Sequence, residues 1–165
     1  MRICSIGAVT LFFVVSAFGA ELKVDVSRII DKLQAGLILG EPVKTPTPRS
    51  GEGTDGYYSK CNYYGASGTK SLVIRLHVAS ASSISAQAQL EMVAATNGGM
   101  QSVSGLGDAA QTFSSGGETG AASRLLMLYV VKGNTFIMVG LGGFADDDLA
   151  LTKAKIVAER ILDQI

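Results

Sequence analysis

Two apolar runs of strand length, residues 125–131 and 135–141, form the strongest pattern in the chain, and only a short polar link separates them. The link contains Gly133-Asn134, a dipeptide typical of the tight turn in a two-residue β-hairpin. We therefore predict a hairpin in which Gly133 and Asn134 make the turn and Leu128 pairs with Val139. Because side chains alternate along a strand, this register assigns every hairpin residue to one of two faces.

Both faces of the predicted hairpin are apolar. One face is purely aliphatic: Leu126, Leu128, Val130, Ile137, Val139 and Leu141. The other face mixes methionines and aromatic residues with two glycines: Leu125, Met127, Tyr129, Val131, Phe136, Met138, Gly140 and Gly142. A hairpin that is apolar on both faces needs a cover on each, so we expect it at the centre of a sheet.

Four further segments have strand character. Residues 57–64 and 70–79 alternate. In the first segment one face carries Tyr57, Ser59, Cys61 and Tyr63 and the other carries Tyr58, Lys60, Asn62 and Tyr64; in the second, Leu72, Ile74, Leu76 and Val78 point inward. The other two segments, residues 101–104 and 109–113, are shorter and lie on either side of Gly105 and Gly107. These two glycines predict a tight turn with positive φ angles.

Three segments have helical periodicity. The first begins at Asp25 or Ser27, the second at Ser82 or Ser83, and the third at Asp146, since these residue types cap helix N-termini. Their apolar stripes are, in order, Ile29, Ile30, Leu33 and Leu37; Ile84, Ala88, Met92 and Ala95; and Ala150, Ala154, Val157, Ala158, Ile161 and Ile165. We expect the third helix to cover the glycine-containing face of the hairpin, because glycines allow close approach.

The order of these elements predicts an α+β fold. It consists of an antiparallel β-sheet of about five or six strands packed with N-terminal, middle and C-terminal helices. Within the single domain, residues 20–41 contribute the N-terminal helix and residues 57–165 the rest. Residues 42–56 hold all three prolines of the chain together with several glycines, so they predict an exposed, mobile loop.

Residues 1–19 have the pattern of a secretory signal peptide. Arg2 precedes an apolar run, and Ala17 and Gly19 are the small residues that a signal peptidase requires. We therefore expect an exported, periplasmic or extracellular protein that is cleaved after Gly19. The alternative is an uncleaved membrane anchor, because residues 3–20 are uncharged.

The composition fits a globular domain, with 47% hydrophobic and 17% charged residues. Acidic and basic residues balance at 14 each, which argues against a strongly basic nucleic-acid-binding surface. We expect no nucleic-acid partner, and contact with a membrane only if the signal segment is retained.

Five features also carry a resemblance: Leu39–Val43 after the first helix, Cys61-Asn62-Tyr63, Val103–Ala110, the Lys132-Gly133 hairpin and the Asp-capped last helix. Together they resemble a group of small exported bacterial proteins, many of them lipoproteins of unknown function, with a PsbP-like or LpqN-like α/β sandwich. The resemblance covers most of the chain after the signal and implies this sandwich fold and an envelope location. Members of this group usually have a lipidated N-terminal cysteine, and often a second cysteine near the first helix that can pair with the one in the Cys-Asn-Tyr strand. Neither has a counterpart here, so neither the lipid anchor nor the disulfide is implied.

The sequence contains no catalytic or metal-binding signature. Cys61 is the lone thiol after the signal, and we expect it to be buried rather than paired between chains. A nucleophilic pair of Cys61 and His77, the single histidine, is a remote alternative. Two such ligands are too few for a structural zinc site, and residues 146–148 are better explained as a helix cap than as a calcium site.

The segment Gly105–Ala110 matches the dinucleotide motif G-x-G-x-x-A, but no buried strand precedes it and no helix follows it. We therefore expect no cofactor, and we interpret the glycines as a structural turn. The protein is expected not to be an enzyme.

Two binding roles remain. The first hypothesis is a non-catalytic binding or accessory role in the cell envelope, with an unknown protein partner. The alternative is a carrier of a small apolar ligand in a groove on the hairpin face that carries Met127, Tyr129, Phe136, Met138, Gly140 and Gly142, since methionines and aromatic residues beside missing bulk suit an adaptable pocket. In the competing interpretation, the C-terminal helix fills this space as ordinary core.

Overall fold

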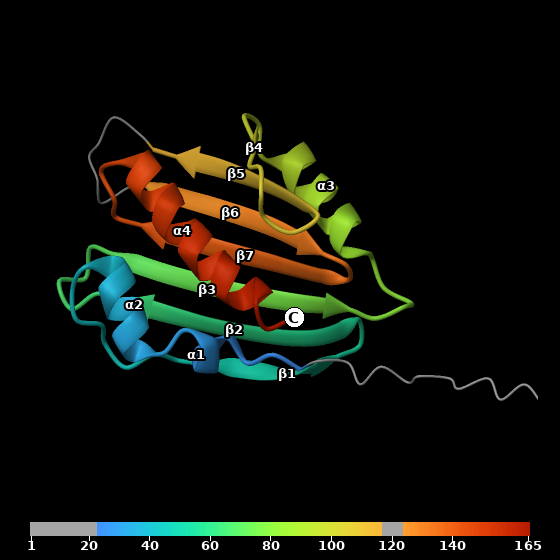
Figure 1. The fold of residues 1–165 in the computed structure, drawn as a ribbon, viewed down its shortest axis with the longest axis horizontal. Coiled ribbons are helices and arrows are strands. Elements are labelled where there is room, and N and C mark those ends of the chain that lie inside the picture. The colour runs from blue at the N-terminus through green and yellow to red at the C-terminus, as the bar shows by residue number, and fades with distance from the viewer. Residues whose placement is uncertain (1–22, 117–123) are drawn as a thin grey trace, which may run out of the picture.

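A computed structural model describes residues 23–116 and 124–165, which form an open antiparallel sheet with helices on both faces (Figure 1). In chain order the elements are α1 Val26–Ile29, α2 Lys32–Leu39, β1 Arg49–Gly53, β2 Gly56–Tyr64, β3 Ser71–Ala79, α3 Ala86–Thr96, β4 Gln101–Ser102, β5 Ala109–Ser115, β6 Leu125–Lys132, β7 Thr135–Gly142 and α4 Asp147–Leu162. The described strands form one seven-stranded sheet in the order β1-β2-β3-β7-β6-β5-β4. The α+β class is thus confirmed, with more strands than the five or six expected. The predicted signal segment, residues 1–19, lies outside the described residues.

The β6-β7 hairpin has the predicted register throughout. Lys132 pairs with Thr135, Leu128 with Val139, and Leu125 with Gly142. Gly133 has a φ of 54°, which the turn requires and which side chains disfavour. The hairpin lies in the middle of the sheet because β7 pairs with β3 on its other side.

The two faces of the sheet are covered by different helices, and the predicted assignment of the covers was wrong. The C-terminal helix α4 packs, with α1 and α2, on the aliphatic face, and the main core lies between them (Figure 1). Helix α3 covers part of the opposite face, where Ala86 and Leu90 pack against Tyr129 and Val131. The physical reason is that the aliphatic face continues across β2 and β3, so it offers the longest helix the larger apolar surface.

The glycines of the hairpin do not leave a notch for a helix. A side chain at Gly140 would meet the Sδ atom of Met127 at 3.0 Å, and one at Gly142 would meet the Oγ atom of Ser71 at 2.7 Å. Side chains from the neighbouring strands therefore fill the space that we had expected a helix to occupy.

The N-terminal helix is divided in two, which overturns the predicted apolar stripe. Ile30 is extended, and Asp31 starts α2 with a reciprocal capping box to Gln34. The break changes the rotational phase of α2, so Ile38 and Leu39 are buried while Leu33 and Leu37 are each 79% exposed.

The middle helix also differs from its prediction. Ser85 rather than Ser82 or Ser83 caps α3, because the Ser85 hydroxyl accepts a hydrogen bond from the Ala88 amide at 3.1 Å. The later start moves the buried stripe to Ala86 and Leu90, and Ile84 and Met92 are exposed.

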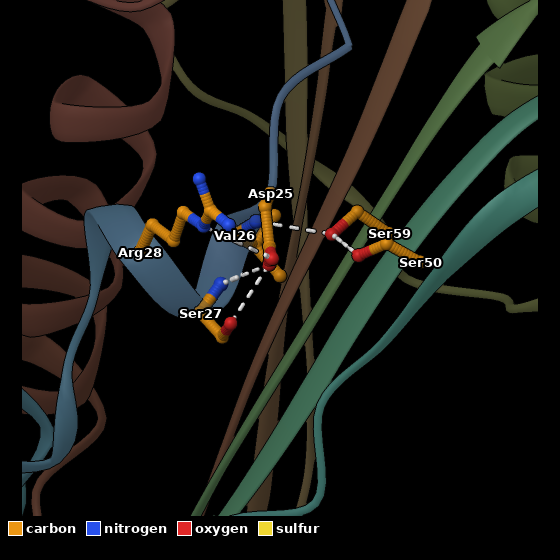
Figure 2. Close-up of polar contacts among 6 residues, drawn as sticks. All are labelled: Asp25, Val26, Ser27, Arg28, Ser50 and Ser59. Atoms are coloured by element: carbon orange, nitrogen blue, oxygen red, sulfur yellow. Dashed lines mark hydrogen bonds and ion pairs between the residues drawn. The ribbon is translucent and has the colours of Figure 1, made fainter.

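Helix α1 is attached to the sheet through a buried serine (Figure 2). The amide of Val26 donates to Ser59 Oγ at 3.0 Å, and Ser59 Oγ lies 2.8 Å from Ser50 Oγ on β1. Asp25 caps the same helix by accepting from the amide and the hydroxyl of Ser27. A single polar residue on the core side of β2 thereby links α1, β2 and β1.

Part of the predicted mobile loop has regular structure. Within residues 42–56, β1 is fully exposed but pairs with β2 from Arg49 opposite Lys60 to Gly53 opposite Gly56. Val43 is buried and forms an isolated bridge to Gly65. The strand lies at one edge of the sheet, where glycine-rich sequence is tolerated because only one side pairs.

Gly105 and Gly107 form the predicted turn between β4 and β5, with φ angles of 81° and 56°. A side chain at Gly107 would collide with the Val131 carbonyl oxygen, whereas Gly105 has open space around it. None of the helices in the described ranges is long and apolar enough to cross a membrane.

Candidate binding groove

Helix α3 covers only part of its face of the sheet, and a groove of about 530 Å³ lies beside it. The groove runs over β1, β2 and β3 and is lined chiefly by Arg49, Gly51, Glu52, Tyr58, Lys60, Arg75, His77, Gln89, Phe136 and Met138. A second hollow, of about 540 Å³, adjoins it under the start of α3 and shares Tyr58, His77, Gln89 and Phe136. Each volume is in the range that small-molecule sites occupy.

An aromatic row crosses the groove from strand to strand. Tyr58 on β2 pairs with His77 on β3, which pairs with Phe136 on β7. The rings of Tyr58 and His77 are stacked, with centroids 4.2 Å apart and planes 4° apart. Tyr58 is 40% exposed, so it presents aromatic surface to the groove.

The first two residues of this row are held in place by polar contacts. His77 Nδ1 lies 3.0 Å from Gln89 Oε1 on α3, and Nε2 lies 3.2 Å from the carbonyl oxygen of Asp55. The Tyr58 hydroxyl donates to the Asp55 carboxylate. This hydrogen bond lowers the pKa of Asp55 and, with a smaller effect of burial, raises the pKa of Tyr58 to about 12. Tyr58 is therefore neutral, and Asp55 charged, across the physiological pH range.

A cationic row lies next to the aromatic row. Arg49 on β1 is directly opposite Lys60 on β2, and Lys60 is directly opposite Arg75 on β3. Lys60 and Arg75 lie two residues from Tyr58 and His77 on the same strands, so both rows are on one face. Among the described residues, none of these three cations has an ion pair or side-chain hydrogen bond.

This cationic row is unfavourable in the protein alone. Like charges directly opposite one another on neighbouring strands are destabilising, and this row contains two such pairs. The acidic residues near the groove offer no compensation, because Glu52 pairs with Lys23 at 2.6 Å and Asp55 accepts from Tyr58.

The edge strand leaves the groove open. Gly51 is directly opposite Tyr58, and a Cβ atom placed on Gly51 would have no other atom within 4 Å. The lack of a side chain at this position therefore exposes the adjacent part of Tyr58 instead of supporting the fold.

The ligand groove predicted from the sequence is only partly the groove that the structure contains. Phe136 and Met138 line it. Tyr129 is buried under α3, and Met127 packs over Gly140. The other four predicted residues, Met127, Tyr129, Gly140 and Gly142, do not line the groove. The groove extends from β7 over β3, β2 and β1, on the side of β7 away from β6.

The thiol and the imidazole do not form a nucleophilic pair. Cys61 is fully buried on the aliphatic side of β2, and burial raises its thiol pKa. His77 is on the opposite face of β3, beneath α3. In the described ranges, no three His, Cys, Asp or Glu side chains cluster as a metal site would require.

Sequence reasoning missed the cationic row. The signal in the sequence was that each strand carries an aromatic residue and a cation two positions apart, Tyr58 with Lys60 and Arg75 with His77. This signal predicts a site only when the β2-β3 register and the existence of β1 are known. Compared with known proteins, the chain matches no protein-family model and no curated protein.

Proposed function

We propose that the protein is an exported envelope protein with a non-catalytic binding role, and that the groove beside α3 is its binding site. The observation that carries this proposal is the half-covered sheet face. Helix α3 shields Tyr129 and Val131, but it leaves Tyr58 exposed and Phe136 and Met138 only partly buried above a groove of about 530 Å³. Aromatic and methionine side chains in a concave site are typical of ligand pockets.

The location is proposed from the first 19 residues, whose charge, apolar run and small residues follow the signal-peptide pattern. N-terminal sequencing of the protein recovered from its host tests this part separately. A mature chain that starts at Ala20 supports export with cleavage, and a chain that starts at Met1 contradicts it.

The binding role is tested by native mass spectrometry of protein purified from its own host. The wild-type protein is expected to retain a partner that is released on denaturation. A Gly51→Trp variant is expected to lose it, because a Cβ atom at Gly51 has open space around it and the ring beyond it would occupy the groove beside Tyr58.

A matched control is Gly98→Trp. Gly98 is exposed after α3, a Cβ atom there also has open space, and the residue lines neither hollow. Retention by the wild type and by this control, with loss in Gly51→Trp, supports the groove as the binding site. Equal retention in all three proteins contradicts it.

The second candidate is the carrier of a small apolar ligand. Fewer residues support this role than the sequence predicts, because only Phe136 and Met138, of the six hairpin residues predicted to form the ligand groove, line the groove in the structure. A neutral apolar molecule released from the wild-type protein would favour this role. A remaining expectation, an accessory role with a protein partner, is favoured if a second polypeptide is released.

A further inference from the structure

From the two adjacent rows of side chains, we infer that the groove binds a small organic anion, whose acidic group contacts the row Arg49-Lys60-Arg75 and whose apolar or aromatic body lies on Tyr58, Phe136 and Met138. This inference rests on the proposed binding role and adds the chemical class of the ligand.

The three cations lack a counter-charge in the protein itself. Three positive side chains stand directly opposite one another across β1, β2 and β3, and no described residue neutralises them. Such an arrangement costs stability in the empty protein. It becomes favourable when an acidic group lies among the three, because each repulsive pair is then bridged by an opposite charge.

The three cations also lie inside a concave site. All three line the same groove, and Glu52, the one acidic residue of the described ranges that lines it, is already paired with Lys23. A phosphate or carboxylate oxygen that enters the groove therefore meets unpaired donors. Arginine suits this contact because its guanidinium presents two parallel donors to such oxygen atoms.

The size of the groove and its aromatic row suit a small molecule. A volume of about 530 Å³ corresponds to the pockets that hold drug-sized compounds rather than to an extended protein interface. The spacing of the side chains also fits a small ligand. Tyr58 and Lys60 are two residues apart on β2, so one small molecule can stack on the tyrosine ring and contact the lysine charge.

The test uses three probes that separate body from charge: 2-naphthyl phosphate, 2-naphthol and inorganic phosphate, titrated into the full mature protein by isothermal calorimetry. The phosphate ester is expected to bind at least about tenfold more tightly than either part alone, because only it uses both rows. A fourth titration with 2-naphthoate distinguishes a carboxylate ligand from a phosphate ligand, and stronger binding than 2-naphthol by either acid supports the inference.

Variants locate the binding. Lys60→Gln and Arg75→Gln are each expected to weaken 2-naphthyl phosphate about tenfold, the loss typical of one charge-assisted contact, and to leave 2-naphthol unchanged. Lys44→Gln is the control, because Lys44 is exposed, forms no ion pair among the described residues and lies outside the groove. Circular dichroism confirms that each variant is folded.

Two outcomes overturn the inference. One is that neither acid binds more tightly than 2-naphthol. The other is that Lys60→Gln and Lys44→Gln bind 2-naphthyl phosphate equally well. Either result leaves the broader binding role open to its own test, since a neutral molecule or a polypeptide retained from the host and lost in Gly51→Trp would still support that role.

Discussion

Replacing Lys60 by glutamate is expected to make the free protein more stable, which is unusual for a single substitution on a folded strand. Lys60 is directly opposite both Arg49 and Arg75, so the wild-type chain has two repulsive cross-strand pairs. Glutamate would turn both into attractive pairs, and glutamine would only remove the repulsion.

The magnitude follows from the pairing. Directly opposite side chains have Cβ atoms about 4.5–5.5 Å apart, and a charged cross-strand pair changes stability by roughly 0.2–1 kcal/mol. Lys60 is exposed, which favours the lower half of this range because water screens the charges. Lys60→Gln should then raise the free energy of unfolding by about 0.5 kcal/mol, and Lys60→Glu by about 1 kcal/mol.

The assay is equilibrium unfolding in urea, which adds no ions, at low salt and at about 1 M salt. The Debye length falls to about 3 Å at 1 M, shorter than the separation of the opposing side chains, so the gain should largely disappear there. Lys44→Glu is the control and should change the free energy of unfolding by less than about 0.5 kcal/mol.

The reasoning is refuted if Lys60→Glu leaves the free energy of unfolding unchanged or lowers it at low salt. It is also refuted if the gain persists at high salt, because a packing effect would not be screened. If the prediction holds, Lys60→Glu should raise stability and abolish binding of 2-naphthyl phosphate together, which separates the role of this residue in the fold from its role in the groove.

Three further substitutions or treatments test the fold. Ser59→Ala should lower the free energy of unfolding by about 1–3 kcal/mol in urea titrations, because the buried amide of Val26 loses its acceptor, and a loss well below this range would mean that another group replaces the hydroxyl. Gly107→Ala should be more destabilising than Gly105→Ala by at least about 1 kcal/mol in the same titrations, since both glycines have positive φ but only Gly107 is crowded. Equal losses would contradict the expected collision of the new side chain with the Val131 carbonyl oxygen. The thiol of Cys61, whose pKa burial raises, should react with a thiol reagent only in denaturant, and rapid labelling of the folded protein would show that it is accessible.

The hairpin could be predicted in detail because its information is local. The link between β6 and β7 allows a two-residue turn at Gly133-Asn134, and once the turn is fixed the register has no freedom. The same holds for Asp146, whose carboxylate accepts from the amides of Asp148 and Leu149 at the start of α4. Short-range hydrogen bonds of this kind are visible in the order of residues.

The covers of the sheet could not be assigned in the same way. Both hairpin faces are apolar, so periodicity does not say which helix packs on which face. The decision depends on β2 and β3, whose inward residues, such as Cys61 and Ile74, extend the aliphatic face and make it the larger one. The phase of α2 was missed for a related reason, because a break at Ile30 looks like continuous helix in the sequence.

The groove was hidden because it is assembled from three strands and one of them was not expected. Arg49 lies in a segment whose prolines and glycines predict a loop, yet it pairs with Lys60 as the edge strand β1. Without β1 there is no row of cations, and without the β2-β3 register Lys60 and Arg75 are unrelated positions. The information that builds the site is therefore long-range.

Helix α3 gives the groove a wall that is separable from the rest of the molecule. Its own apolar cluster is small, centred on Ala86 and Leu90, while the main core lies on the other side of the sheet. Elements with few buried contacts open at lower free energy than the global transition, so the α3 amides should exchange hydrogen before those of β3 or β7. A ligand in the groove contacts the sheet beside α3. Ligand binding should therefore slow the hydrogen exchange of the α3 amides and leave the exchange rates of the amides in the central strands unchanged.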